Sequence, residues 1–188
     1  NKEGGWSDNV FKYSTGKITE VKINNLPAAK KSFLPSLPKS RPRYADKLKQ
    51  ANRIISNEKP WTKGLYEGVI AVDLIFKQKL DQKNRISLIL LDSTLEIAFK
   101  EFLVNESGVA YGDVALFKLF SNRSDVQNEI KKYISLDPGI WRKINYYYKF
   151  ICKLVHEKVT VGIDDSDVEN YRKVIQKVLR RLFKLHFN

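Results

Sequence analysis

The residues best suited to chemistry lie within one stretch, residues 149–157, which contains Lys149, Cys152, Lys153 and His156. Residues three and four apart are neighbours on a helix, so a helical stretch would place a lysine, a thiol and an imidazole on one face. Histidine has an unperturbed pKa of about 6.5 and can act as a general acid or base near neutral pH. An equally good structural explanation is a histidine at a helix end, where it interacts favourably with the last carbonyl groups.

Composition restricts the class of protein. The net charge is +13, and positions 1–50 hold 11 Lys and Arg against 4 Asp and Glu. Such an excess favours a polyanionic partner, most often nucleic acid. The single cysteine excludes an intramolecular disulfide framework and fits a reducing compartment, so we expect a cytoplasmic protein. No apolar run reaches the roughly 18–20 residues of a membrane span and no signal peptide is visible, so no membrane partner is expected.

Several kinds of site are missing from the sequence. It has no glycine-rich phosphate loop and no serine-centred nucleophile elbow. With one cysteine and two distant histidines, it also lacks zinc-ligand spacing. We therefore expect no cofactor and no metal, and any catalysis would depend on His156 and nearby polar groups. Because the chain contains no methionine, we expect a piece of a longer protein with a further domain upstream.

The first 43 residues differ from the rest. Two β-rich runs at 10–13 and 18–23 flank a short glycine turn, which predicts a hairpin within 1–26, a remnant of an upstream domain. Residues 27–43 combine four prolines with basic residues and predict an extended linker. The linker is either an arm that contacts nucleic acid or, as we favour, a solvated tether. Its candidate contacts are Lys39, Arg41 and Arg43.

From residue 44 onward apolar residues recur at helical spacing. The fold class we predict for 44–188 is all-α, an antiparallel bundle of five to seven helices. A glycine at position 68 indicates close packing against another helix. The last helix has the clearest apolar stripe, and capping boxes are predicted at Ser124 and Ser166. The expected helices are 44–56, 60–76, 82–104, 124–135, 140–156 and 166–188, and residues 114–120 form a short apolar segment.

Polar and aromatic residues on two of these helices are candidate functional groups. Asp92 and Glu96 lie four residues apart on the most apolar helix and need partners there. We favour a structural pair, bound to a lysine or to the end of another segment, over acid–base catalysis. On the helix 140–156, the spacing predicts that one stripe faces inward. Its members are Trp141, Ile144, Tyr148, Ile151 or Cys152, and Val155.

Three stretches together resemble the HEPN superfamily, particularly its RiboL-PSP-like prokaryotic members: residues 90–96, 147–157 and 164–172. The resemblance implies a helical, often dimeric domain, and many members are metal-independent ribonucleases of defence, toxin or RNA-processing systems. Their motif is an arginine followed, after four to six residues, by a histidine at a helix end. His156 fits this motif, but the arginine positions hold Ile151 or Lys149, and lysine lacks the planar fork of arginine.

Three functions remain open. We favour a nucleic-acid-binding module of a larger prokaryotic defence-type protein, with RNA preferred over DNA, a homodimer and a degenerate HEPN site. One alternative is a ribonuclease in which His156 acts on a 2′-hydroxyl while Lys149 or Lys153 stabilises the developing phosphorane charge. The other is a purely structural interaction domain tethered to an upstream ATPase-like domain. The candidate nucleic-acid contacts are Arg142, Lys143 and Tyr147, with Lys39, Arg41 and Arg43 of the linker.

Overall fold

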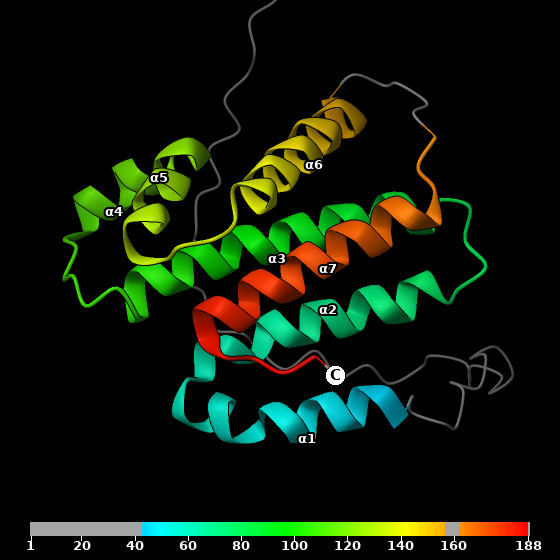
Figure 1. Cartoon of the computed structure of the whole chain (residues 1–188), viewed down its shortest axis with the longest axis horizontal. Helices are drawn as coiled ribbons and strands as arrows, with labels where there is room; N and C mark the ends of the chain where they lie inside the picture. Colours follow the sequence, from blue (N-terminus) through cyan, green and yellow to red (C-terminus); the bar gives the residue numbers. More distant parts are fainter. Residues whose placement is uncertain (1–42, 157–161, 188) are drawn as a thin grey trace, which may run out of the picture. The chain divides into compact units, whose positions relative to one another are not determined.

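The computed structural model describes residues 43–156 and 162–187, which form seven α-helices and one 3-10 turn and contain no strand (Figure 1). The all-α prediction is confirmed for these residues, and none of their helices is long and apolar enough to cross a membrane. The expected hairpin and residues 27–42 of the linker lie outside the described residues. The elements are α1 (Arg43–Glu58), η1 (Pro60–Thr62), α2 (Lys63–Phe76), α3 (Lys83–Asn105), α4 (Asp113–Phe120), α5 (Arg123–Tyr133), α6 (Pro138–His156) and α7 (Asp165–Phe183).

The central helix is α3, which packs against α2, α5, α6 and α7. Its start lies beside the start of α7, where Lys83 Nζ is 3.2 Å from a carboxylate oxygen of Asp165. Near the other ends of the two helices, the rings of Phe102 and Phe183 are 6.1 Å apart. The two helices are therefore parallel (Figure 1), and the expectation of an antiparallel bundle is wrong for this pair. The cause is α6, which runs antiparallel to α7 and returns the chain to the start of α3.

Close packing of α2 on α3 depends on a glycine. A Cβ built on Gly68 would lie 2.5 Å from Oγ1 of Thr94, a hydroxyl that donates a hydrogen bond to the carbonyl of Leu90. No real side chain tolerates such a separation without a shift, so only glycine lets the helices approach this closely. The close packing predicted at this position is confirmed.

The helix starts differ from the two predicted capping boxes. Asn122, not Ser124, caps α5, and its side chain accepts a hydrogen bond from the Ser124 amide. Asp164 caps α7 in a capping box with Asp167, so this helix begins before Ser166. Both boxes were placed two residues late, because Asn and Asp are as effective as Ser in this position.

The buried stripe of α6 is rotated relative to the predicted one. Ile144 and Ile151 are buried as expected, but Tyr147 replaces Tyr148, which is 36% exposed. Val155 is also exposed, and Trp141 lies at the flank against Phe99. The reason is that α6 contacts neighbours on both flanks, so aromatic residues occur on both sides of its inward face. The buried residues are Ile140, Ile144, Tyr147, Ile151 and Leu154.

Candidate functional site

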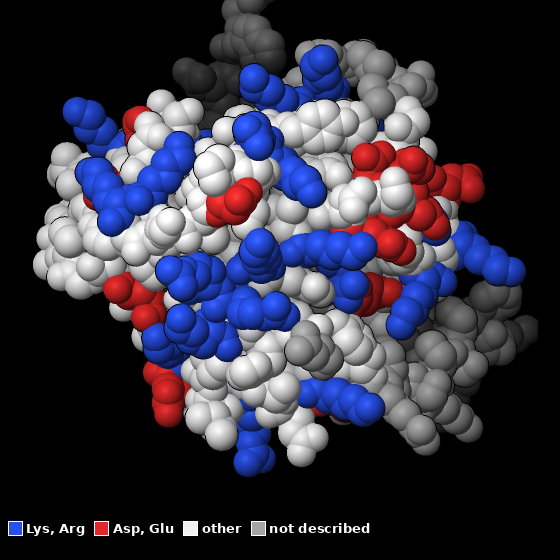
Figure 2. Space-filling model, in the orientation of Figure 1, with Lys and Arg blue, Asp and Glu red and all other residues white. Residues whose placement is uncertain are grey.

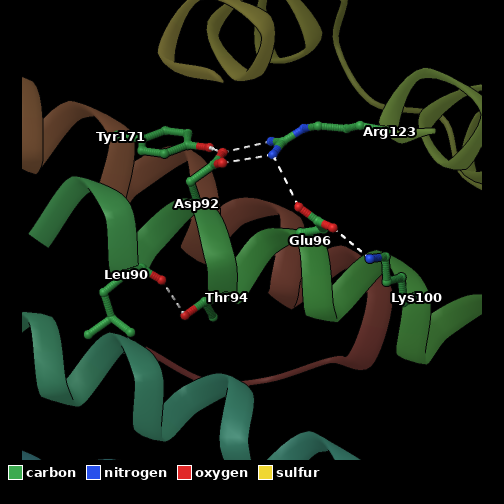
Figure 3. Close-up of polar contacts among 7 residues, drawn as sticks. All are labelled: Leu90, Asp92, Thr94, Glu96, Lys100, Arg123 and Tyr171. Carbon is green, nitrogen blue, oxygen red and sulfur yellow. Dashed lines mark hydrogen bonds and ion pairs between the residues drawn. The ribbon is translucent and has the colours of Figure 1, made fainter. Parts of the chain in front are cut away.

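A polar cluster occupies the interior between α3, α5 and α7 (Figure 3). Arg123, at the start of α5, donates from Nη1 and Nη2 to the two carboxylate oxygens of Asp92 at 2.7 and 2.6 Å. The hydroxyl of Tyr171 donates to the same carboxylate at 2.6 Å. Asp92 and Tyr171 are buried, and the side chain of Arg123 is only 11% exposed. Asp92 therefore joins three helices through charge-assisted hydrogen bonds.

The electrostatics of the cluster match a structural role. Burial lowers the pKa of Arg123, but the hydrogen bond and charge of Asp92 raise it by more, so it lies above its ordinary value. Burial and the neighbouring Asp92 raise the pKa of Tyr171 well above 10. Glu96 pairs with Lys100 at 2.6 Å and lies 3.7 Å from Arg123. These pairings between opposite charges support a structural role for the cluster over proton transfer. The two carboxylates are thus paired, as the sequence suggested, although Asp92 binds an arginine.

Two of the three predicted catalytic residues, Lys149 and Lys153, lie on the solvent-facing side of α6. Lys149 and Lys153 are exposed and four residues apart, which makes them neighbours on the helix surface. Cys152 is half-buried on the flank beside Tyr148, whose ring lies 4.1 Å from the guanidinium of Arg123. His156 is the last residue of α6, and its side chain lies outside the described residues.

The residues predicted to contact nucleic acid differ in their exposure to solvent. Arg142 is exposed on α6, whereas Tyr147 is 5% exposed and its ring stacks on Tyr171 at 4.4 Å. Burial, helped by Asp167, raises the pKa of Tyr147 to about 12. A ring in this position has no free face for a base. Lys39 and Arg41 of the linker, and the side chain of Arg43, lie outside the described residues.

The remaining predicted contact, Lys143, lies in a groove between α6 and α7. Two adjoining hollows of about 290 and 480 Å³ form this α6–α7 groove, and Asp137, Ile140 and Lys177 line both. Figure 2 shows basic side chains gathered over the C-terminal half of α7, on the viewed face. The cationic residues that line the groove are Lys143, Lys173, Lys177, Arg180, Arg181 and Lys184.

The groove continues toward α5. A third hollow of about 550 Å³ shares Ser135, Leu136 and Arg181 with it and is also lined by Lys131 and Lys132. The three hollows together have one carboxylate among their described lining residues, Asp137, which accepts a hydrogen bond from the Gly139 amide. The surface is therefore strongly cationic along its whole length.

Comparison with protein-family models, curated proteins and solved structures finds no match for the chain. The HEPN resemblance therefore remains a prediction. Nor do the described residues contain a group of three or more His, Cys, Asp and Glu placed to hold a metal ion.

Two aromatic rings extend the cationic surface along α6. Tyr146 is 58% exposed, and its ring lies nearly parallel to that of Phe150, with centroids 6.1 Å apart. Tyr146 lies three residues after Lys143, about one helical turn along α6. The sequence marked the tyrosine triplet at 146–148 as aromatic, but it did not indicate which ring is exposed beside the groove.

Proposed function

We propose that residues 43–188 bind single-stranded RNA, with the phosphates lying along the α6–α7 groove. The observation that carries this proposal is the convergence of six cationic side chains, five from α6 and α7 and one from Lys184 just after α7, around one groove whose described lining has a single carboxylate. Like charges gathered on one surface repel one another and raise the local concentration of a polyanion. Nucleic acid is the polyanion whose regular phosphates match an extended row of cations.

A simpler explanation of the basic residues is compensation of the helix dipole. Cations in the last turn of a helix interact favourably with its partial negative charge, and Arg180 and Arg181 occupy that turn of α7. The effect falls off within one turn. Lys173 and Lys177 lie further from the end of the helix and Lys143 is on another helix, so the dipole does not account for them.

An exposed aromatic ring favours single-stranded over double-stranded nucleic acid as the ligand. Bases of single-stranded nucleic acid stack on aromatic side chains beside a positively charged groove, whereas paired bases are already stacked. Tyr146 offers an exposed ring about one helical turn along α6 from Lys143, which lines the groove. The choice of RNA over DNA is supported by the resemblance to HEPN domains.

The test is equilibrium binding of a fluorescently labelled single-stranded RNA, measured by anisotropy at several salt concentrations. Each phosphate contact contributes about 0.7 to the slope of log K against log salt for single strands. The double variant Lys177→Glu, Arg181→Glu should therefore bind more weakly, with a slope shallower by about 1.4. The matched control is Lys47→Glu, Lys118→Glu, which makes the same charge change at exposed residues away from the groove.

Two results would contradict the proposal. One is affinity that does not change with salt, and the other is an equal loss in the groove and control variants. A matching DNA strand, measured alongside, tests the preference for RNA. The ribonuclease alternative can be tested in the same samples on a denaturing gel: it requires cleavage by the native chain and none by His156→Ala.

A further inference from the structure

A separate hollow, with a volume of about 560 Å³, lies between α2 and α7 on the side of α7 away from α6. Its lining includes two half-buried aromatic residues, Tyr44 and Phe76, and two buried valines, Val72 and Val168. This volume lies within the roughly 300–1,000 Å³ typical of pockets for small ligands, which are mostly apolar with a few placed polar groups. We call it the α2–α7 pocket.

The less exposed polar groups of the pocket pair with one another. Arg172 contacts both carboxylate oxygens of Asp73, at 2.7 and 2.8 Å, and donates to the hydroxyl of Tyr44 at 3.1 Å. Because this ion pair is internally neutral, the inner part of the pocket carries no net charge. It therefore suits the flat, uncharged part of a ligand, such as a nucleobase, rather than an anionic group.

The exposed residues at the mouth are charged. Lys77, just after α2, and Lys173, on α7, provide cations from the two walls, and Glu169 provides one carboxylate. A ligand that fits both regions has a planar apolar part inside and an anionic group at the mouth. A nucleotide has this arrangement, since its base is planar and its phosphate is anionic.

Lys173 belongs to two sites, because it lines both the α2–α7 pocket and the α6–α7 groove. In Figure 1, α7 lies between α2 and α6 on the viewed face, so a chain that crosses α7 at Lys173 passes from the groove to the pocket. A nucleotide in the middle of a strand continues in both directions, whereas a terminal one can end inside a pocket.

We propose that the α2–α7 pocket holds the phosphorylated terminal nucleotide of an RNA strand whose remaining phosphates lie along the α6–α7 groove. The inference rests on the proposed function, since it names the part of the RNA that the second site recognises. The base packs against Tyr44 and Phe76, and the terminal phosphate lies between Lys77 and Lys173.

The experiment compares RNAs of one sequence in four forms, using the full chain of 188 residues. These are a linear strand with a 5′-phosphate, one with a 3′-phosphate, one with two hydroxyl ends, and a circular strand without ends. One phosphorylated linear RNA should bind roughly tenfold more tightly than the circular RNA, since charge-assisted hydrogen bonds to a phosphate are strong. Lys77→Glu should abolish this preference and leave the affinity for circular RNA within about twofold.

Two further variants make the experiment decisive. Glu169→Gln removes the carboxylate at the mouth and should strengthen the preference for the phosphorylated end severalfold, a gain that misfolding would not produce. Lys47→Glu serves as the control for a charge change elsewhere and should leave the preference unchanged. Equal affinity for linear and circular RNA, or a preference that survives Lys77→Glu, would overturn the end pocket and leave groove binding intact. The absence of any RNA binding would overturn the proposed function and this inference together.

Discussion

The interior cluster around Asp92 permits a quantitative prediction. Replacing Asp92 by alanine removes the carboxylate that accepts hydrogen bonds from Arg123 and Tyr171. The guanidinium of Arg123 is 11% exposed and the Tyr171 ring is fully buried, so neither group regains full hydration. Leaving a buried charge without its partner costs about 3–5 kcal/mol. Glu96 lies 3.7 Å from Arg123 and can approach it further, so we expect the lower end of this range.

The loss should be visible in urea unfolding followed by circular dichroism. Because small domains are stable by only about 5–15 kcal/mol, Asp92→Ala should shift the unfolding midpoint strongly. The matched control is Glu96→Ala, which removes a carboxylate one turn later on the same helix. Its side chain is 40% exposed, and such surface pairs contribute about 0–1 kcal/mol.

A second comparison separates the cost of an unpaired charge from the contribution of the pair. Replacing both partners, as in Asp92→Leu with Arg123→Met, leaves no buried charge and should destabilise less than Asp92→Ala alone. If Asp92→Ala lost no more free energy of unfolding than Glu96→Ala, the guanidinium would have to reach water. The reasoning from burial would then be wrong.

Two more predictions concern stability. Gly68→Ala should cost about 1–3 kcal/mol in thermal unfolding, because the new methyl group meets Thr94 Oγ1. Gly64→Ala, on the same helix but with open space around the new methyl group, should instead stabilise the protein by up to about 1 kcal/mol. A change in stability of the same sign in both variants would contradict the packing argument. Asp164 has a lowered pKa because the Ser166 hydroxyl and backbone amides donate to its carboxylate. The stabilisation that ionised Asp164 provides is present above the ordinary pKa of 3.8 and is lost as the pH falls through the lowered pKa. Acid should therefore reduce the stability of the native chain more steeply than that of the Asp164→Asn variant.

The helices were largely predictable because their apolar spacing is regular. The apolar stripe predicted near the C-terminus is fully buried, and its six residues are Val168, Tyr171, Ile175, Val178, Leu182 and Leu185. Prediction was less accurate on α6, where the three tyrosines at 146–148 give several faces a similar apolar character. The inward ring is Tyr147 because Tyr171 of α7 is available to stack on it. That contact joins residues 24 positions apart in the sequence, and helical spacing does not contain it.

Contacts between residues far apart in the sequence also limited the prediction of the polar cluster and of the groove. The sequence indicated that Asp92 needs a partner, but Arg123 lies 31 residues away on another helix, where nothing local marks it as that partner. The groove is harder still to predict, because it combines the flank of one helix with the outer face of another. Lys143 was a candidate on charge and position alone, whereas Lys173 and Lys177 resembled the solvated face of an amphipathic helix.

The direction of α7 decides which charges meet. Its first turns are acidic and its later turns basic, with Asp165 and Asp167 at one end and Arg180 and Arg181 at the other. Because α7 is parallel to α3, the acidic end lies beside Lys83 and is partly neutralised there. Because it is antiparallel to α6, the basic end lies beside the first turns of α6, where no carboxylate occurs within the helix. The opposite direction would bring the acidic end to that place and leave no cationic groove, so the cationic groove follows from the topology as much as from the composition.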